Sequence, residues 1–144
     1  MSVEIKRVYE PPSLSDGERV LVDRLWPRGL KKAAARIDVW LKELAPSHEL
    51  RRWFHERPEY FSVFRKRYLQ EMAAPAASQA LQQLYEIAQK KKTVTLVYAA
   101  KDEAHNNAVV LRDLLQGMRK PPSSSGPARA AAARVRARMP RGRS

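Results

Sequence analysis

Short runs of apolar residues along this chain predict four β-strands. Residues 93–100 (TVTLVYAA) are apolar at successive positions, which is typical of a central strand covered on both faces. Residues 3–8 and 19–25 predict two further strands, and the second must stop before Pro27 because proline cannot extend the interior of a sheet. Residues 37–44 show both alternating and helical spacing, and of the two interpretations we favour the strand.

Between these runs, apolar residues recur at helical spacing and predict a series of helices. A short helix is expected over residues 31–36. Ser47 is a good N-cap for a second helix, and Pro58 suits the first turn of a third helix, which Pro75 should end. Ser78 should then cap a fourth.

A last helix is expected to begin at Asp102 or Glu103, directly after the central strand, and to run to Gly117. Helices therefore alternate with strands along the chain, which is the pattern of an α/β domain. We expect a small three-layer domain with a mainly parallel central sheet.

The distribution of charge divides the chain into two parts. The 144 residues carry 28 basic and 15 acidic side chains, a net charge of +13. Residues 119–144 hold eight of the basic side chains and no acid, so residues 1–118 carry only +5. We therefore expect an α/β domain over 1–118 and a disordered Ala/Arg/Pro-rich tail over 119–144, because the tail has too little apolar content to form a core.

The basic tail suggests a sequence-tolerant contact with nucleic acid, which its arginines would form through phosphate groups. The candidate residues are Arg129, Arg134, Arg136, Arg138, Arg141 and Arg143. A solvated extension without a dedicated role is the alternative. Inside the domain we interpret the basic run Arg65-Lys66-Arg67 as the solvated side of a helix.

Composition excludes several classes of protein and site. Without cysteine the chain has no disulfide, no thiolate nucleophile and no cysteine-ligated metal. His48, His55 and His105 lack the spacing of metal ligands, so no metal site is expected. No apolar run approaches about 18 residues and no signal sequence begins the chain, so we expect no membrane contact and a cytoplasmic location.

Polar side chains gather where two predicted strands end, at the edge where α/β sheets usually bind ligands. The predicted ligand-binding residues are Arg24, Trp26, Arg28, Tyr98, Lys101, Asn106 and Asn107. Guanidinium groups bind carboxylate or phosphate through paired hydrogen bonds, which indicates an anionic small molecule or nucleotide as ligand.

Three side chains at the same strand ends are candidates for acid–base chemistry, namely Asp23, Asp102 and His105. Each also has a structural interpretation. Asp23 can form an ordinary ion pair at a strand end, Asp102 can cap a helix, and His105 can be an exposed helix residue. The sequence therefore leaves open whether the protein is an enzyme, and it indicates no cofactor.

Several stretches closely resemble the YeaO-like family of bacterial proteins, which belongs to a superfamily catalogued as domain of unknown function 488. They are residues 7–12, 16–29 (with VDRLWPRG), 44–47, 50–54, 67–68, 95–102 and 106–108. The resemblance covers about residues 3–117 and leaves the tail outside. It implies a compact α/β domain in a cytoplasmic protein, without an established reaction.

The order of elements is also similar, more distantly, to rhodanese domains, in which a catalytic cysteine follows the second strand. The absence of cysteine rules out persulfide transfer here. Three functions remain as hypotheses. The favoured one is a domain that binds, and could act on, an anionic small molecule or nucleotide. The alternatives are nucleic-acid association through the tail and a non-catalytic regulatory or interaction module.

Overall fold

The computed structural model describes residues 2–117, so the predicted tail and its arginines lie outside the described residues. Its centre is a four-stranded sheet in which every pair of neighbouring strands is parallel, in the order β1-β4-β2-β3. The strands are β1 (Ser2–Arg7), β2 (Glu18–Leu21), β3 (Val39–Trp40) and β4 (Thr93–Tyr98). The predicted α/β class with a parallel sheet is confirmed.

Strand β4 is the inner strand that the sequence predicts. It pairs with β1 on one side, where Ser2 lies opposite Thr93, and with β2 on the other, where Glu18 lies opposite Val94. All its side chains from Val94 to Tyr98 are buried, because helices cover one face of the sheet and a folded loop covers the other.

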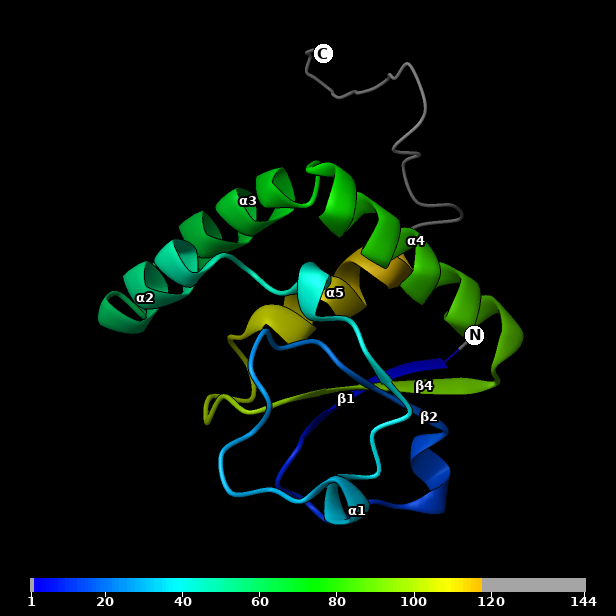
Figure 1. The fold of residues 1–144 in the computed structure, drawn as a ribbon. Coiled ribbons are helices and arrows are strands. Elements are labelled where there is room, and N and C mark those ends of the chain that lie inside the picture. The colour runs from blue at the N-terminus through cyan, green and yellow to red at the C-terminus, as the bar shows by residue number, and fades with distance from the viewer. Residues whose placement is uncertain (1, 118–144) are drawn as a thin grey trace.

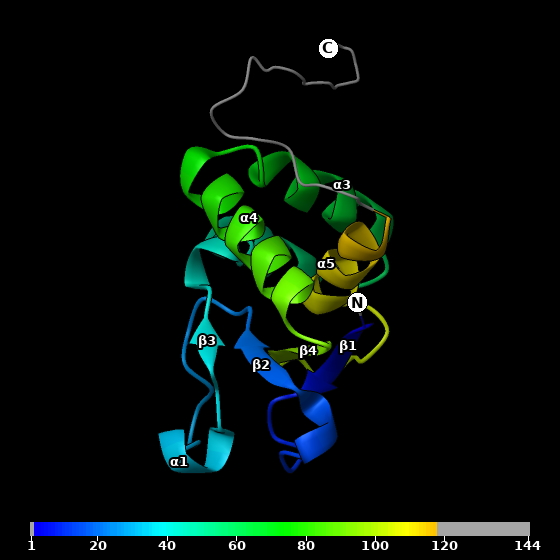
Figure 2. The ribbon, with the colours of Figure 1, turned by 90° about the vertical axis from the view of Figure 1, so that its right-hand side faces the viewer.

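The helices are distributed unequally over the two faces of the sheet. Figures 1 and 2 show the long helices gathered on one face, while a short helix and long loops lie on the other. The larger group consists of α2 (His48–Glu56), α3 (Phe61–Glu71), α4 (Pro75–Lys90) and α5 (Asn107–Gln116), and the short helix is α1 (Lys32–Ala35). Two 3₁₀ turns complete the fold, η1 (Leu14–Asp16) and η2 (Lys42–Leu44).

Each face of the sheet has its own apolar core. On the helical face, Val20 and Leu96 of the sheet pack with Phe64, Leu84 and Leu111 in one large cluster. The other cluster is smaller, with Val8, Leu21 and Val97 at its centre. Trp26, Leu30, Ile37 and Trp40 cover it. The outer layer on that side is therefore formed mainly by the loop between β2 and β3.

Several helix boundaries in the structure differ from those that the sequence predicts. Helix α3 ends at Glu71, and Pro75 begins α4 instead of ending α3, because proline suits the first position of a helix, where its missing N–H is not needed. Ser78 consequently lies buried inside α4 and does not cap it. Pro58 lies before α3, which begins at Phe61.

The strand ends also differ in detail. The strand predicted over 19–25 ends at Leu21, and the segment 37–44 divides into the two-residue strand β3 and the turn η2. The strand interpretation and the helix interpretation of that segment are therefore each partly right. Helix α2 follows Ser47 as predicted, and the Ser47 side chain accepts a hydrogen bond from the Leu50 N–H.

A buried ion cluster joins the elements at the amino end of the sheet. Asp16 accepts hydrogen bonds from Arg19 Nη1 at 2.7 Å and Lys6 Nζ at 3.1 Å. Arg19 is only 3% exposed, and its guanidinium also donates to the carbonyl groups of Ala35 and Arg36. Such a cluster stabilises the fold only when every charge is paired, as it is here.

Gly17, between η1 and β2, is required by both conformation and space. Its φ is +65°, and an added Cβ would collide with the carbonyl oxygen of Thr93. Gly17→Ala should therefore lower the free energy of unfolding by about 2–4 kcal/mol, measured by urea denaturation. Gly29 is the control, because it has a φ of +75° but nothing within 4 Å of an added Cβ. Gly29→Ala should cost only about 1–2 kcal/mol, and an equal cost at both positions would contradict the predicted collision.

Candidate functional site at the carboxyl edge of the sheet

The carboxylate of Asp23 joins three elements at the carboxyl edge of the sheet. It follows β2, and one oxygen accepts a hydrogen bond from the Ala99 N–H at 2.8 Å, directly after β4. The other oxygen accepts from Asn107 Nδ2 at 3.1 Å, in the first turn of α5. Asn107 Nδ2 also donates to the Val22 carbonyl at 2.9 Å, and the Asp23 carbonyl accepts from the Trp40 indole at 2.7 Å.

Burial raises the pKa of Asp23 above its usual value, although the hydrogen bonds from Ala99 and Asn107 and the nearby charge of Arg51 act in the opposite direction. A raised carboxyl pKa at a strand end is a common property of catalytic acids. Here, however, both oxygens accept hydrogen bonds from the protein itself. The geometry therefore gives Asp23 a structural task, which is to hold the strand ends together.

The start of α5 is built by residues that the sequence placed inside the helix. Asn106 is its N-cap, and its side-chain oxygen accepts from the Val109 N–H at 3.0 Å. Asp102 does not begin the helix, because its carboxylate closes a separate turn with the N–H groups of Ala104 and His105. The Asp102 carbonyl accepts from Asn106 Nδ2 at 2.8 Å, which connects that turn to the cap.

Asp102 and His105 form an exposed pair. His105 Nδ1 lies 3.1 Å from Asp102 Oδ2, and the two side chains are 51% and 55% exposed, respectively. The hydrogen bond from the Ala104 N–H, followed by the interactions with His105, lowers the pKa of Asp102. The His105 ring contacts the edge of Phe61. Neither residue lines the cavity described next, so they do not share a site with Arg24.

A cavity of about 330 Å³ lies beside Arg24, between the end of β2 and helices α3 and α4. Arg24 Nη2 donates to the Ala45 carbonyl at 3.2 Å. The Nε–H of the same guanidinium is buried and has no hydrogen-bond partner among residues 2–117. Buried polar groups are normally paired, so an unpaired donor on a residue that lines the cavity is an exception.

Four further polar residues line the cavity, namely Glu43, Ser47, Tyr68 and Glu71. Tyr68 is fully buried, and its hydroxyl donates to the Leu44 carbonyl at 2.5 Å. Glu71 accepts from the N–H and the hydroxyl of Ser47, at 2.8 and 2.5 Å. Burial raises the pKa of Tyr68 well above its usual value, and the charges of Asp23 and Glu71 add to the shift while Arg24 opposes it.

Tyr68 and Glu71 were not among the sequence candidates, and Ser47 was recognised only as a helix cap. One signal in the sequence could have pointed to the site. Tyr68 is the only residue with a hydroxyl group on the apolar side of its predicted helix, and a buried tyrosine hydroxyl usually requires a partner.

The structure separates two predicted ligand-binding residues from Arg24. Trp26 belongs to the smaller core, where it forms a T-shaped pair with Trp40, with 5.6 Å between the ring centres. Its Nε1 donates a hydrogen bond to the Leu30 carbonyl. Arg28 lies exposed in the loop after β2, and its carbonyl accepts from the Tyr9 hydroxyl at 3.0 Å. Neither lines the cavity.

The remaining predicted residues have other surroundings. Tyr98 is buried at the end of β4, and burial, followed by the charge of Glu103, raises its pKa. Lys101 is exposed in the loop before α5, while Asn106 and Asn107 are engaged in capping and in holding Asp23. Of the seven predicted ligand-binding residues, only Arg24 lines this cavity.

Two further properties concern the part of the chain that the structure describes. None of its helices is long and apolar enough to cross a membrane. Within residues 2–117, no three His, Cys, Asp or Glu side chains are grouped so that they could hold a metal ion.

Comparison with known proteins shows the family. A family model described as the inactive DUF488-N3 subclade matches residues 2–130. The chain belongs to the DUF488 family. The resemblance to YeaO-like proteins is thereby confirmed, and the match reaches beyond Gly117, so part of the tail lies within the family pattern.

Two of the relatives of this DUF488 protein show how much of the chain is shared. Uncharacterized protein YeaO of Escherichia coli (strain K12) is 47% identical over 118 residues, which is 82% of this chain and 100% of that protein. Uncharacterized protein Rv3073c of Mycobacterium tuberculosis (strain ATCC 25618 / H37Rv) is 44% identical over 115 residues, which is 80% of this chain and 94% of that protein. No solved structure matches.

Asp23 and Asp16 should respond to pH in opposite ways, because their pKa values shift in opposite directions. The raised pKa of Asp23 means that its contribution to stability is greatest below the usual value of 3.8 and falls as the pH rises through the folded pKa. For Asp16, burial favours a higher pKa, but hydrogen bonds from Ser13, Lys6 and Arg19 outweigh it and lower the pKa. Its contribution is therefore present above 3.8 and is lost on acidification.

Urea denaturation of the wild type, Asp23→Asn and Asp16→Asn between roughly pH 3 and pH 7 measures both effects. Asp16→Asn should cost about 3 kcal/mol at neutral pH, because Arg19 loses its buried partner, and less in acid. The cost of Asp23→Asn should instead grow as the pH falls. Parallel pH profiles for the two variants would contradict this interpretation.

Proposed function

We propose that this domain binds a small molecule with one anionic group in the cavity beside Arg24 and does not catalyse its conversion. The observation that carries the proposal is the state of the Arg24 guanidinium. It has five N–H donors, its Nε–H is buried without a partner among the described residues, and the Ala45 carbonyl accepts from Nη2. A buried donor that stays unpaired costs about 1–3 kcal/mol, which a carboxylate or phosphate oxygen would recover.

The rest of the lining limits the ligand to one negative charge and favours an apolar part, because the charged side chains around the cavity, Arg24, Glu43 and Glu71, sum to −1. Met72 and three alanines, Ala74, Ala76 and Ala77, provide apolar surface. Glu43 and Glu71 also line the cavity and would repel a multiply charged anion. A volume of about 330 Å³ lies at the lower end of the range for small-molecule sites.

The absence of catalysis is supported by the surroundings of the acid–base candidates. Each carboxylate oxygen of Asp23 accepts a hydrogen bond from the protein. Asp102 and His105 lie in an exposed turn that does not line the cavity. The family description also calls the subclade inactive. Binding without turnover fits these observations better than an enzyme does.

A thermal-shift screen of the full chain against monocarboxylates and phosphate diesters, which carry one negative charge each, tests the proposal. A ligand present at about 100 times its Kd should stabilise the protein by about 2.7 kcal/mol, which raises the Tm by several degrees. Arg24→Gln should weaken binding of that ligand at least about tenfold, because the charge-assisted hydrogen bond is lost.

Arg28→Gln is the matched control, since Arg28 is an exposed arginine four residues away that does not line the cavity. It should leave the ligand-induced shift unchanged. The proposal fails if Arg24→Gln keeps the full shift, or if Arg28→Gln abolishes it.

A further inference from the structure

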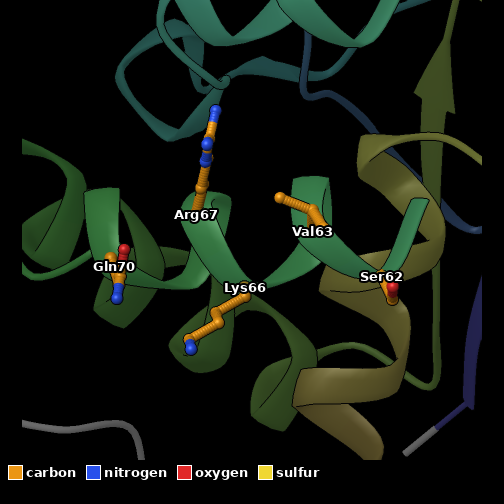
Figure 3. A pocket seen from close by; sticks show the side chains of 5 residues that line it. All are labelled: Ser62, Val63, Lys66, Arg67 and Gln70. Atoms are coloured by element: carbon orange, nitrogen blue, oxygen red, sulfur yellow. The ribbon is translucent and has the colours of Figure 1, made fainter. Parts of the chain in front are cut away.

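The outer side of α3 carries a second hollow, which is unrelated to the Arg24 cavity. It has a volume of about 590 Å³ and is lined by Ser62, Val63, Lys66, Arg67 and Gln70, shown in Figure 3. Four of these five side chains can donate hydrogen bonds, and none is a carboxylate. The lining therefore carries a net charge of +2 and suits an anionic ligand.

Within the described residues, no ion pair neutralises the two positive charges of this hollow. The neighbouring Arg65 forms an ion pair with Asp113 of α5, at 3.3 Å. Lys66 and Arg67 are exposed and form no ion pair within residues 2–117. The basic run that the sequence presented as one solvated surface thus divides into a structural arginine and two available cations.

An aromatic stack continues the surface from Arg67. The Arg67 guanidinium lies over the ring of Trp53, 4.4 Å from its centre, and Figure 3 shows Arg67 extending away from Lys66. The ring of Tyr60 stacks against the same tryptophan, with 6.3 Å between the ring centres, and Tyr60 is 49% exposed. Trp53 thereby connects the charged hollow to an open aromatic ring.

We propose that this surface, formed by Lys66, Arg67 and Tyr60, binds single-stranded nucleic acid. Phosphate groups would contact the two cations, and an unstacked base would pack on the exposed tyrosine ring. Basic grooves with adjacent aromatic rings bind single strands without strong sequence preference, because every base has a face that can stack. A duplex keeps its bases stacked internally and cannot use the ring in this way.

The position where the described structure ends supports a long anionic partner. The ion pair between Arg65 and Asp113 places the last turns of α5 beside α3. The described chain ends one turn later at Gly117, and the sequence then continues with eight basic residues and no acid. A strand bound on α3 therefore lies close to Gly117, after which the sequence is strongly basic.

Fluorescence anisotropy of the full chain with labelled oligo(dT) and oligo(U) of about 20 nucleotides tests the proposal, with a duplex of equal length as the comparison. The variant Lys66→Glu/Arg67→Glu should weaken single-strand binding at least about tenfold and lower the slope of log affinity against log salt by roughly 1.4. The wild type should prefer the single strands.

Matched controls separate this surface from general charge attraction. Lys31→Glu/Lys32→Glu makes the same change in charge at α1, on the opposite side of the sheet, and should weaken binding less than about threefold. Tyr60→Ser should weaken binding about tenfold, whereas Tyr9→Ser, at a tyrosine that is 44% exposed, should not. Equal effects of the two charge pairs, equal effects of the two tyrosine variants, or preference for the duplex would each overturn the proposal.

Discussion

The half-buried carboxylate of Asp23 forms the hydrogen bonds on which the carboxyl edge of this domain depends. One side chain accepts hydrogen bonds from the segments that follow β4 and begin α5, while its own backbone follows β2. The end of β2 is thereby fixed to the end of β4 and the start of α5, which lie 76 and 84 positions further along the chain. Because Arg24 is the next residue, the same constraint places its guanidinium beside the cavity.

Helix α3 contributes to both proposed sites through its different sides. Tyr68 and Glu71 line the Arg24 cavity, while Lys66 and Arg67 line the outer hollow. These residues are neighbours in the sequence, but successive helix positions turn by about 100°, so short segments present unlike chemistry to different surroundings. Helix α3 can therefore support a mixed-polarity cavity and a basic surface at once.

Local signals were reliable where one residue and its near neighbours decide the structure. The inner strand β4 and the Ser47 cap of α2 were both predicted, since continuous burial and N-capping are visible within a few positions. Prediction failed at Pro75 and Asp102, where two local solutions compete. Proline is compatible with ending one helix or beginning the next, and an aspartate with capping a helix or closing a separate turn.

By itself the sequence determined the α/β class, the division of charge between domain and tail, and the resemblance to the YeaO-like family. Tertiary structure alone decided which polar side chains meet. Arg24 reaches Ala45 across 21 positions, and Ser47 and Glu71 meet across 24, while Trp26 turns into the smaller core instead of a binding site. Periodicity within one helix or strand carries no information about such contacts, because they depend on how separate elements pack against each other.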